Sequence, residues 1–277
     1  MDGERQIDHV VIAVSDLDRV VGQYQALGFT VTPRGYHDWG TMNQLVQFPG
    51  ANFVELLAIE AAARIPEHAL DEIPPRFSFG AHNRDFLARG EGMSMLVLSG
   101  NDSRADVAAF AARGLTTYAP FDFTRQARQP DGSEVEVAFS LAFASYSAAP
   151  RVGLFTCHNR YPQYFYRPTY QSHANGVAAI TAVVTSATEP QPFANVLADF
   201  AGGVAVPDGA GYRVGCGPHN LLVLPPDGVA ERYPGAGVAQ SDETRLVGFM
   251  VEGPHLQPRT IPASAAGGAF IVFRESR

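Results

Sequence analysis

The sequence contains little cysteine, no block of basic residues and no apolar run of membrane-spanning length. Its two cysteines, Cys157 and Cys216, lie far apart, which suits a reducing compartment and is too few for a cysteine-based zinc site. The net charge of −8 disfavours nucleic acid and anionic membranes as partners. No apolar run approaches the ~20 residues of a membrane span, and no basic-then-apolar signal pattern opens the chain. We therefore expect a soluble cytoplasmic protein.

The chain does contain a unit of strands and one helix with a strong apolar pattern. Its 277 residues exceed the roughly 100–150 of a typical domain, which favours two domains or a duplicated fold. A strand is expected over 7–14, followed by a helix that Ser15 caps together with Asp18 and that Gly28 ends. A β-α-β-β-β unit is completed by three further expected strands, over 29–32, 43–48 and 52–59.

The unit repeats along the chain. Three glycines, Gly28, Gly114 and Gly202, end the expected helices at almost equal separations, which indicates an internal repeat. We expect paired modules 1 and 2 over residues 1–160, a linker over 161–175, and modules 3 and 4 over 176–277, the fourth shortened and without its helix. One unit covers only one face of its sheet, so a second unit must pair with it. The predicted fold is α+β, with tandem β-α-β-β-β modules that pair into curved mixed sheets around a cleft.

Two polar residues interrupt the apolar strands of the first unit. Because side chains alternate along a strand, His9 shares a face with Ile7 and Val11, and Glu55 shares a face with Phe53. If the first and last strands of the unit are neighbours, the imidazole and the carboxylate converge and supply half of a divalent metal site. The alternatives are a core histidine with satisfied hydrogen bonds and an exposed glutamate at a sheet edge.

Several segments resemble the vicinal oxygen chelate superfamily, which includes glyoxalase I, extradiol dioxygenases and bleomycin resistance proteins. The glyoxalase-like subgroup is the closer match. The resemblance covers residues 6–60 most strongly and 90–185 less so. The segments that carry it are 7–17, 27–29, 35–43 (Gly-Tyr-His-Asp-Trp-Gly-Thr-Met-Asn), 53–57, 155–158 and 164–168.

The resemblance implies paired modules around a cleft that often holds a divalent metal, here Zn, Fe, Mn or Ni. By position, His9 and Glu55 match the superfamily's first-strand and last-strand ligands. In the second module, the position that matches His9 falls within residues 93–95, and the position that matches Glu55 is Phe155 or Cys157. His158 could be a displaced third ligand, the alternative being a solvated histidine at a strand end.

Other candidate residues surround the expected cleft. His37 and Asn43 lie in the glycine-flanked loop, where His37 could serve as a general base and Asn43 could bind substrate; an exposed turn is the alternative. Arg125 and Arg128 could clamp a substrate carboxylate, or could be solvated on a hairpin with a turn at 130–132.

Two functions follow from these features. The first is a metal-dependent enzyme, of the lyase and isomerase or the ring-cleaving dioxygenase type, that acts on a small chelating oxygenated substrate; Glu55 would also move a proton, as in glyoxalase I. The second is a non-catalytic protein that binds or sequesters small molecules. In both, the partner is a small molecule, and the sequence leaves a homodimer open.

Overall fold

The computed structural model describes residues 5–128 and 134–276, without the side chains of residues 127 and 128. The expected hairpin turn at 130–132 therefore lies outside the described residues, and so does the side chain of Arg128. Within the described part of the chain, no helix combines the length and apolarity that crossing a bilayer requires.

Four modules follow one another along the chain. The first half consists of β1 (Ile7–Ala13), α1 (Leu17–Ala26), β2 (Gly35–Tyr36), β3 (Thr41–Gln47) and β4 (Phe53–Ile59), then η1 (Ala62–Arg64) and α2 (Phe79–Leu87), then β5 (Gly92–Ser99), α3 (Ser103–Ala112), β6 (Thr116–Thr117), β7 (Phe121–Arg128), β8 (Glu134–Ser145), β9 (Gly153–Asn159) and α4 (Pro162–Phe165). The second half consists of β10 (Ala179–Ser186), α5 (Pro190–Ala201), β11 (Ala205–Asp208), β12 (Gly211–Cys216), β13 (His219–Leu224) and α6 (Pro226–Arg232), then β14 (Arg245–Gly253), β15 (Arg259–Ile261), η2 (Ala263–Ala265) and β16 (Phe270–Glu275).

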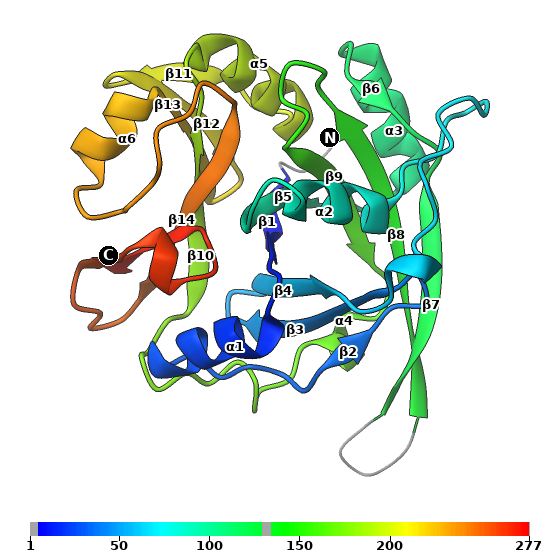
Figure 1. Ribbon diagram of the computed structural model, residues 1–277, viewed down its shortest axis with the longest axis horizontal. Coiled ribbons are helices and arrows are strands. Elements are labelled where there is room, and N and C mark those ends of the chain that lie inside the picture. The colour runs from blue at the N-terminus through cyan, green and yellow to red at the C-terminus, as the bar shows by residue number, and fades with distance from the viewer. Residues whose placement is uncertain (1–4, 129–133, 277) are drawn as a thin grey trace.

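The same pairing rule holds in every module: the first strand runs parallel to the last. Modules then join in pairs through their first strands, β1 with β5 and β10 with β14, both antiparallel. This gives one sheet in the order β2-β3-β4-β1-β5-β9-β8-β6, with β7 on β8, and another in the order β11-β12-β13-β10-β14-β16-β15. The sheets occupy the right and left of Figure 1. The predicted fold class is confirmed; the domain boundaries stay a prediction.

The residues predicted to end the helices are confirmed, whereas the residue predicted to cap the first helix is not the one observed. Gly28, Gly114 and Gly202 all have positive φ, which is the conformation a glycine supplies after a helix. The N-cap of α1, however, is Asp16 and not the expected Ser15, and that of α3 is Asp102; both carboxylates accept from backbone N–H groups of the first turn. The expected strand over 29–32 is not a regular strand, because only Thr32 pairs with β3 there.

A shared core joins the two sheets. One cluster of buried side chains includes residues of α1, α3, α5 and both sheets, and Phe110 of α3 lies with its ring centroid 5.1 Å from that of Phe200 of α5. Asn52 is fully buried at this junction. Its Nδ2 donates to the Ile180 carbonyl over 2.8 Å, and its Oδ1 accepts from the Ile180 N–H over 3.0 Å. The amide thus ties the start of β4 to β10.

We expect Asn52→Ala to lower the free energy of unfolding by about 2–4 kcal/mol, because it leaves the buried N–H and C=O of Ile180 without these partners. Urea denaturation measures this, with Asn101→Ala at an exposed position as the control. A loss equal to that of the control would contradict the role of Asn52.

The connection between modules 1 and 2 contains a helix, α2, that the sequence reasoning did not predict. Ser78 caps it by accepting from the N–H of Ala81. His82 on this helix donates from Nε2 to the Ser94 carbonyl over 3.3 Å, and burial lowers the pKa of His82 from 6.5 to about 4. The helix is therefore held by a neutral histidine.

This stabilisation should be complete above pH 6.5 and be lost as the pH falls towards 4, because the unfolded chain takes up the proton first. We expect His82→Gln, which keeps a donor, to remove up to about 3 kcal/mol of acid destabilisation between these pH values. Unfolding measured against pH tests this, with exposed His255→Gln as the control. Equal pH slopes for the parent and His82→Gln would contradict it.

Candidate functional site

A pocket lies on the concave face of the first sheet. Its empty space, including the open mouth, is about 520 Å³. The wall is mainly aromatic and combines residues of both modules with one residue from α2 and one from α4. Its aromatic residues are Trp39, Phe53, Phe79, Phe123, Phe139, Phe155 and Phe165, and its polar residues are His9, Asn43, Glu55, Arg125 and Cys157.

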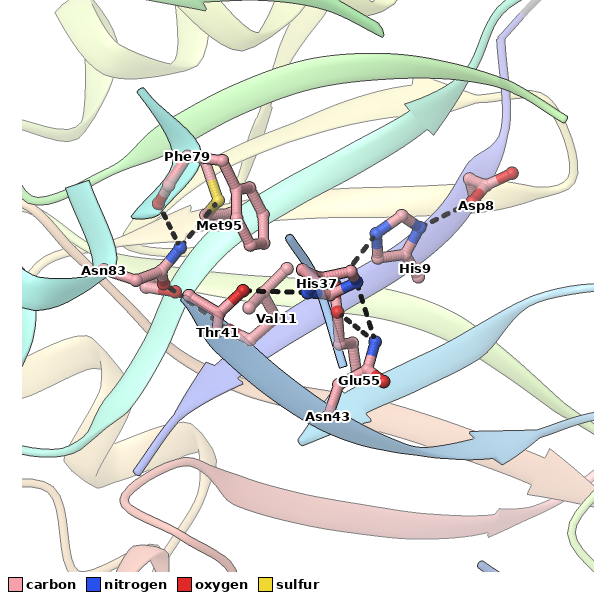
Figure 2. A network of polar contacts seen from close by, with 11 residues as sticks. Asp8, His9, Val11, His37, Thr41, Asn43, Glu55, Phe79, Asn83 and Met95 are labelled. Carbon is pink, nitrogen blue, oxygen red and sulfur yellow. Dashed lines mark hydrogen bonds and ion pairs between the residues drawn. The ribbon is translucent and has the colours of Figure 1, made fainter. Parts of the chain in front are cut away.

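Glu55 is the carboxylate at the base of this pocket. It is 6% exposed, on β4, in parallel register with Val11 of β1. Asn43 of β3 donates from Nδ2 to Oε1 over 2.7 Å, while Oε2 lies 3.8 Å from Nε2 of His9 (Figure 2). The structure therefore brings His9 and Glu55 together, as strand alternation predicted.

His9 is held from both sides. Its Nδ1 lies 2.5 Å from Oδ1 of Asp8, and its ring stacks on Phe53 with centroids 4.2 Å apart. A proton on Nδ1 that donates to Asp8 leaves the Nε2 lone pair directed towards Glu55, a tautomer assigned from this geometry. Asp8 thus fixes which nitrogen of His9 faces the pocket.

His37 lies one layer behind the pocket. Its ring stacks on Trp39, with centroids 4.6 Å apart, and is absent from the pocket wall within the described residues. Nδ1 is 2.8 Å from Oγ1 of Thr41, and Nε2 accepts from Nδ2 of Asn43 over 3.4 Å. Burial lowers the pKa of His37, although Glu55 opposes this shift. A neutral His37 orients Asn43, which in turn holds Glu55 (Figure 2).

Arg125 brings the positive charge to the pocket. It lies on β7, which within the described residues pairs with β8 alone, and it faces inward with Phe121 and Phe123. Burial lowers its pKa, and the charge of Glu55 opposes this shift. Among the residues that the structure describes, none forms a hydrogen bond or ion pair with its guanidinium. A Cβ built on Gly35 would lie 3.4 Å from its Nη1, so β2 confines the group.

Among the strands that the structure describes, the polar pair of His9 and Glu55 has no counterpart at the equivalent positions of the other three modules. The register of β1 with β5 and of β5 with β9 places Met95 at the position of His9 and Phe155 at that of Glu55. In the second sheet, the strand registers place Ala182 of module 3 and Gly248 of module 4 at the position of His9. They place Leu222 of module 3 and Val272 of module 4 at the position of Glu55.

The donor set does not fit a resident metal ion. His9 and Glu55 are two suitable donors, whereas catalytic zinc sites usually have three protein ligands. His158 lies on the opposite face of β9 from Cys157, and burial raises the pKa of the Cys157 thiol, which keeps it protonated. In the described part of the chain, no group of three or more His, Cys, Asp and Glu side chains could hold an ion. Arg125 adds a competing cation to the same pocket.

Two elements of the wall were missed from sequence. Phe79 begins α2, where the Ser78 cap and the spacing to Phe86 were the available signals. Phe165 comes from α4, inside the expected linker. This segment contacts the end of β3, where Nε2 of Gln47 donates to the Phe165 carbonyl over 2.9 Å, and the turn after it, where the Tyr166 hydroxyl donates to the Ala51 carbonyl over 2.7 Å. The expected linker therefore forms part of the pocket.

The glyoxalase-like domain model matches residues 7–200 of this chain. No curated protein matches the chain. A hypothetical protein from Staphylococcus aureus is similar in structure, with a TM-score of 0.74 and 13% identity over 98% of this chain and 100% of that one. A triple mutant of 4-hydroxymandelate synthase from Streptomyces coelicolor has a TM-score of 0.52 and 12% identity over 91% of this chain and 71% of that one. Because this family model matches more than half of the chain, the chain belongs to the glyoxalase-like domain family.

Proposed function

We propose that the protein is an enzyme of the lyase and isomerase type that moves a proton at the carbon next to a carbonyl group. The observation that carries this proposal is the Glu55 carboxylate, buried in an aromatic pocket with one oxygen held by Asn43 and the other turned towards His9. A carboxylate removed from water and held in one orientation is well suited to act as a general base.

The proton transfer balances within the pocket. Glu55 takes the proton from the carbon, the electron pair of the C–H bond moves to the carbonyl oxygen, and an enolate forms. Arg125 donates hydrogen bonds to that oxygen and stabilises its new charge, which favours the transition state. The protonated Glu55 carboxyl then returns the same proton to the neighbouring carbon, as an isomerisation requires, while the Nε2 lone pair of His9 faces that carboxyl from 3.8 Å. His37 and Thr41 position Asn43 and do not touch the substrate.

In this mechanism Arg125 takes the charge-stabilising role for which a divalent metal was expected. No step passes through a metal ion, because the donor set does not fit one. For the same reason we do not propose ring cleavage by an iron-bound oxidant. The substrate class is a small carbonyl compound with an apolar head that fits among the phenyl rings.

A second candidate function is binding without chemistry. The aromatic wall favours it, because stacking and apolar contact alone can hold a flat ligand. The two functions differ in what they require of Glu55: a binder needs no base, whereas the enzyme loses its reaction without one.

We expect the protein to catalyse exchange of the methylene protons of phenylacetone or phenylpyruvate with D₂O, followed by proton NMR. Glu55→Gln should reduce the catalysed rate by about 100-fold or more, because an amide cannot accept the proton. Arg125→Gln should reduce it about 10–100-fold through loss of oxyanion stabilisation.

The control is His158→Gln, on the far face of β9, which should exchange at the parental rate. Ligand binding without any catalysed exchange would support the binding function and contradict the enzyme.

Metal analysis of protein purified without chelators should find no stoichiometric Zn, Fe, Mn or Ni, and exchange should survive treatment with EDTA. The physical reason is that two donors next to a guanidinium hold an ion weakly. One equivalent of metal that is lost in both His9→Ala and Glu55→Ala would overturn this part of the proposal.

A further inference from the structure

A second cavity adjoins the inner pocket on the side of Arg125. Its empty space, open mouth included, is about 620 Å³, and it shares Asn43, Leu45, Arg125 and Phe165 with the inner pocket. The two cavities are therefore adjacent, and these four residues form the boundary between an apolar inner part and an outer part. We call the outer part the basic vestibule; its side chains include Arg34, Arg125, Arg167, Tyr164 and Tyr170.

The charged side chains that line the basic vestibule are cationic, although the whole chain is acidic. Three guanidinium groups line it and, among the residues that the structure describes, no carboxylate does, although the chain carries a net charge of −8. The sequence contains no lysine, so all its permanently cationic side chains are guanidiniums, which bind carboxylate and phosphate in bidentate geometry. Such a local reversal of sign attracts an anion.

The arginines of the basic vestibule are anchored before any ligand arrives. Arg34 forms an ion pair with Asp18 of α1. The backbone N–H of Arg167 donates to Oε1 of Gln47 over 3.2 Å, and its Nη2 donates to the Tyr164 carbonyl over 3.2 Å. Because these contacts restrict the side chains, less conformational entropy is lost when an anion binds.

We propose that the basic vestibule is an anion subsite, and that the substrate is therefore an extended molecule with two parts. The apolar carbonyl head occupies the inner pocket beside Glu55, and a phosphate or carboxylate tail lies between Arg34 and Arg167. Arg125, at the junction, contacts the carbonyl oxygen of the head. The identity of the head rests on the proposed function; the anionic tail rests on the basic vestibule alone.

The single tryptophan of the chain makes this testable, because Trp39 lines the inner pocket and its fluorescence reports occupancy of the head. The probes are phenylalkyl phosphates of increasing chain length, with the matched carboxylates and neutral alcohols. We expect at least about tenfold tighter binding of the best phosphate or carboxylate than of its alcohol, with an advantage that shrinks at high salt. The comparison of phosphate with carboxylate identifies the tail.

Arg34→Ala combined with Arg167→Ala should reduce the advantage of the anionic probe to about threefold or less, because two charge-assisted contacts are removed. Binding of the alcohol should stay unchanged, which also shows that the variant is folded. Arg213→Ala, at an exposed position on β12, is the matched control and should keep the full advantage. Equal binding of anion and alcohol by the parent would overturn the proposal, as would an equal loss in the Arg213→Ala control.

The experiment separates this proposal from the proposed function. Glu55→Gln should keep the preference for anionic probes while it loses proton exchange. A parent that prefers anions and catalyses no exchange contradicts the proposed function and supports the anion subsite. Catalysed exchange without any preference for anions contradicts the anion subsite alone.

Discussion

The structure of this pocket depends on the burial of one carboxylate. Glu55 is almost fully removed from water, and an ionised carboxylate in an apolar surrounding is costly unless donors and charges compensate it. Asn43 supplies a direct hydrogen bond and Arg125 supplies positive charge from the other module, while Nε2 of His9 lies 3.8 Å from the second oxygen. Thr41 and His37 in turn fix the amide of Asn43. Several strands of the first sheet therefore contribute residues that surround the two carboxylate oxygens of Glu55.

Because the module is repeated, one copy can carry the buried polar pair while the other copies have only a structural role. The equivalent positions in the other modules carry apolar side chains or glycine, so they add no buried charge. In the second sheet, α6 and the turn after it cover the concave face, where Val229 and Tyr233 pack with Leu222 and Phe270. The second sheet thus has a filled cleft, whereas the first keeps an open one.

Strand periodicity made part of this site predictable. His9 and Glu55 were expected on one face because alternation along a strand is local, and parallel pairing of β1 with β4 then brings them together. The depth of His37 was not predictable, because it depends on Trp39 folding back against Phe121 and Phe123 of a distant hairpin. The place of α4 was also hidden, since no local pattern shows that a tyrosine-rich connection contacts the end of β3. At the start of α1, Ser15 was expected as the cap in place of Asp16 because both residue types cap well and the two are neighbours in the sequence.

The central claim is that Glu55 and Arg125 together form a centre that stabilises an enolate. A crystal structure with phenylacetohydroxamate, whose anion resembles an enolate, tests it most directly. We expect the phenyl ring to lie among the aromatic side chains, the hydroxamate oxygen to bind the Arg125 guanidinium, and the adjacent carbon to face the Glu55 carboxylate. A hydroxamate that chelates a metal ion held by His9 and Glu55, or one bound with Glu55 turned out of the pocket, would contradict it.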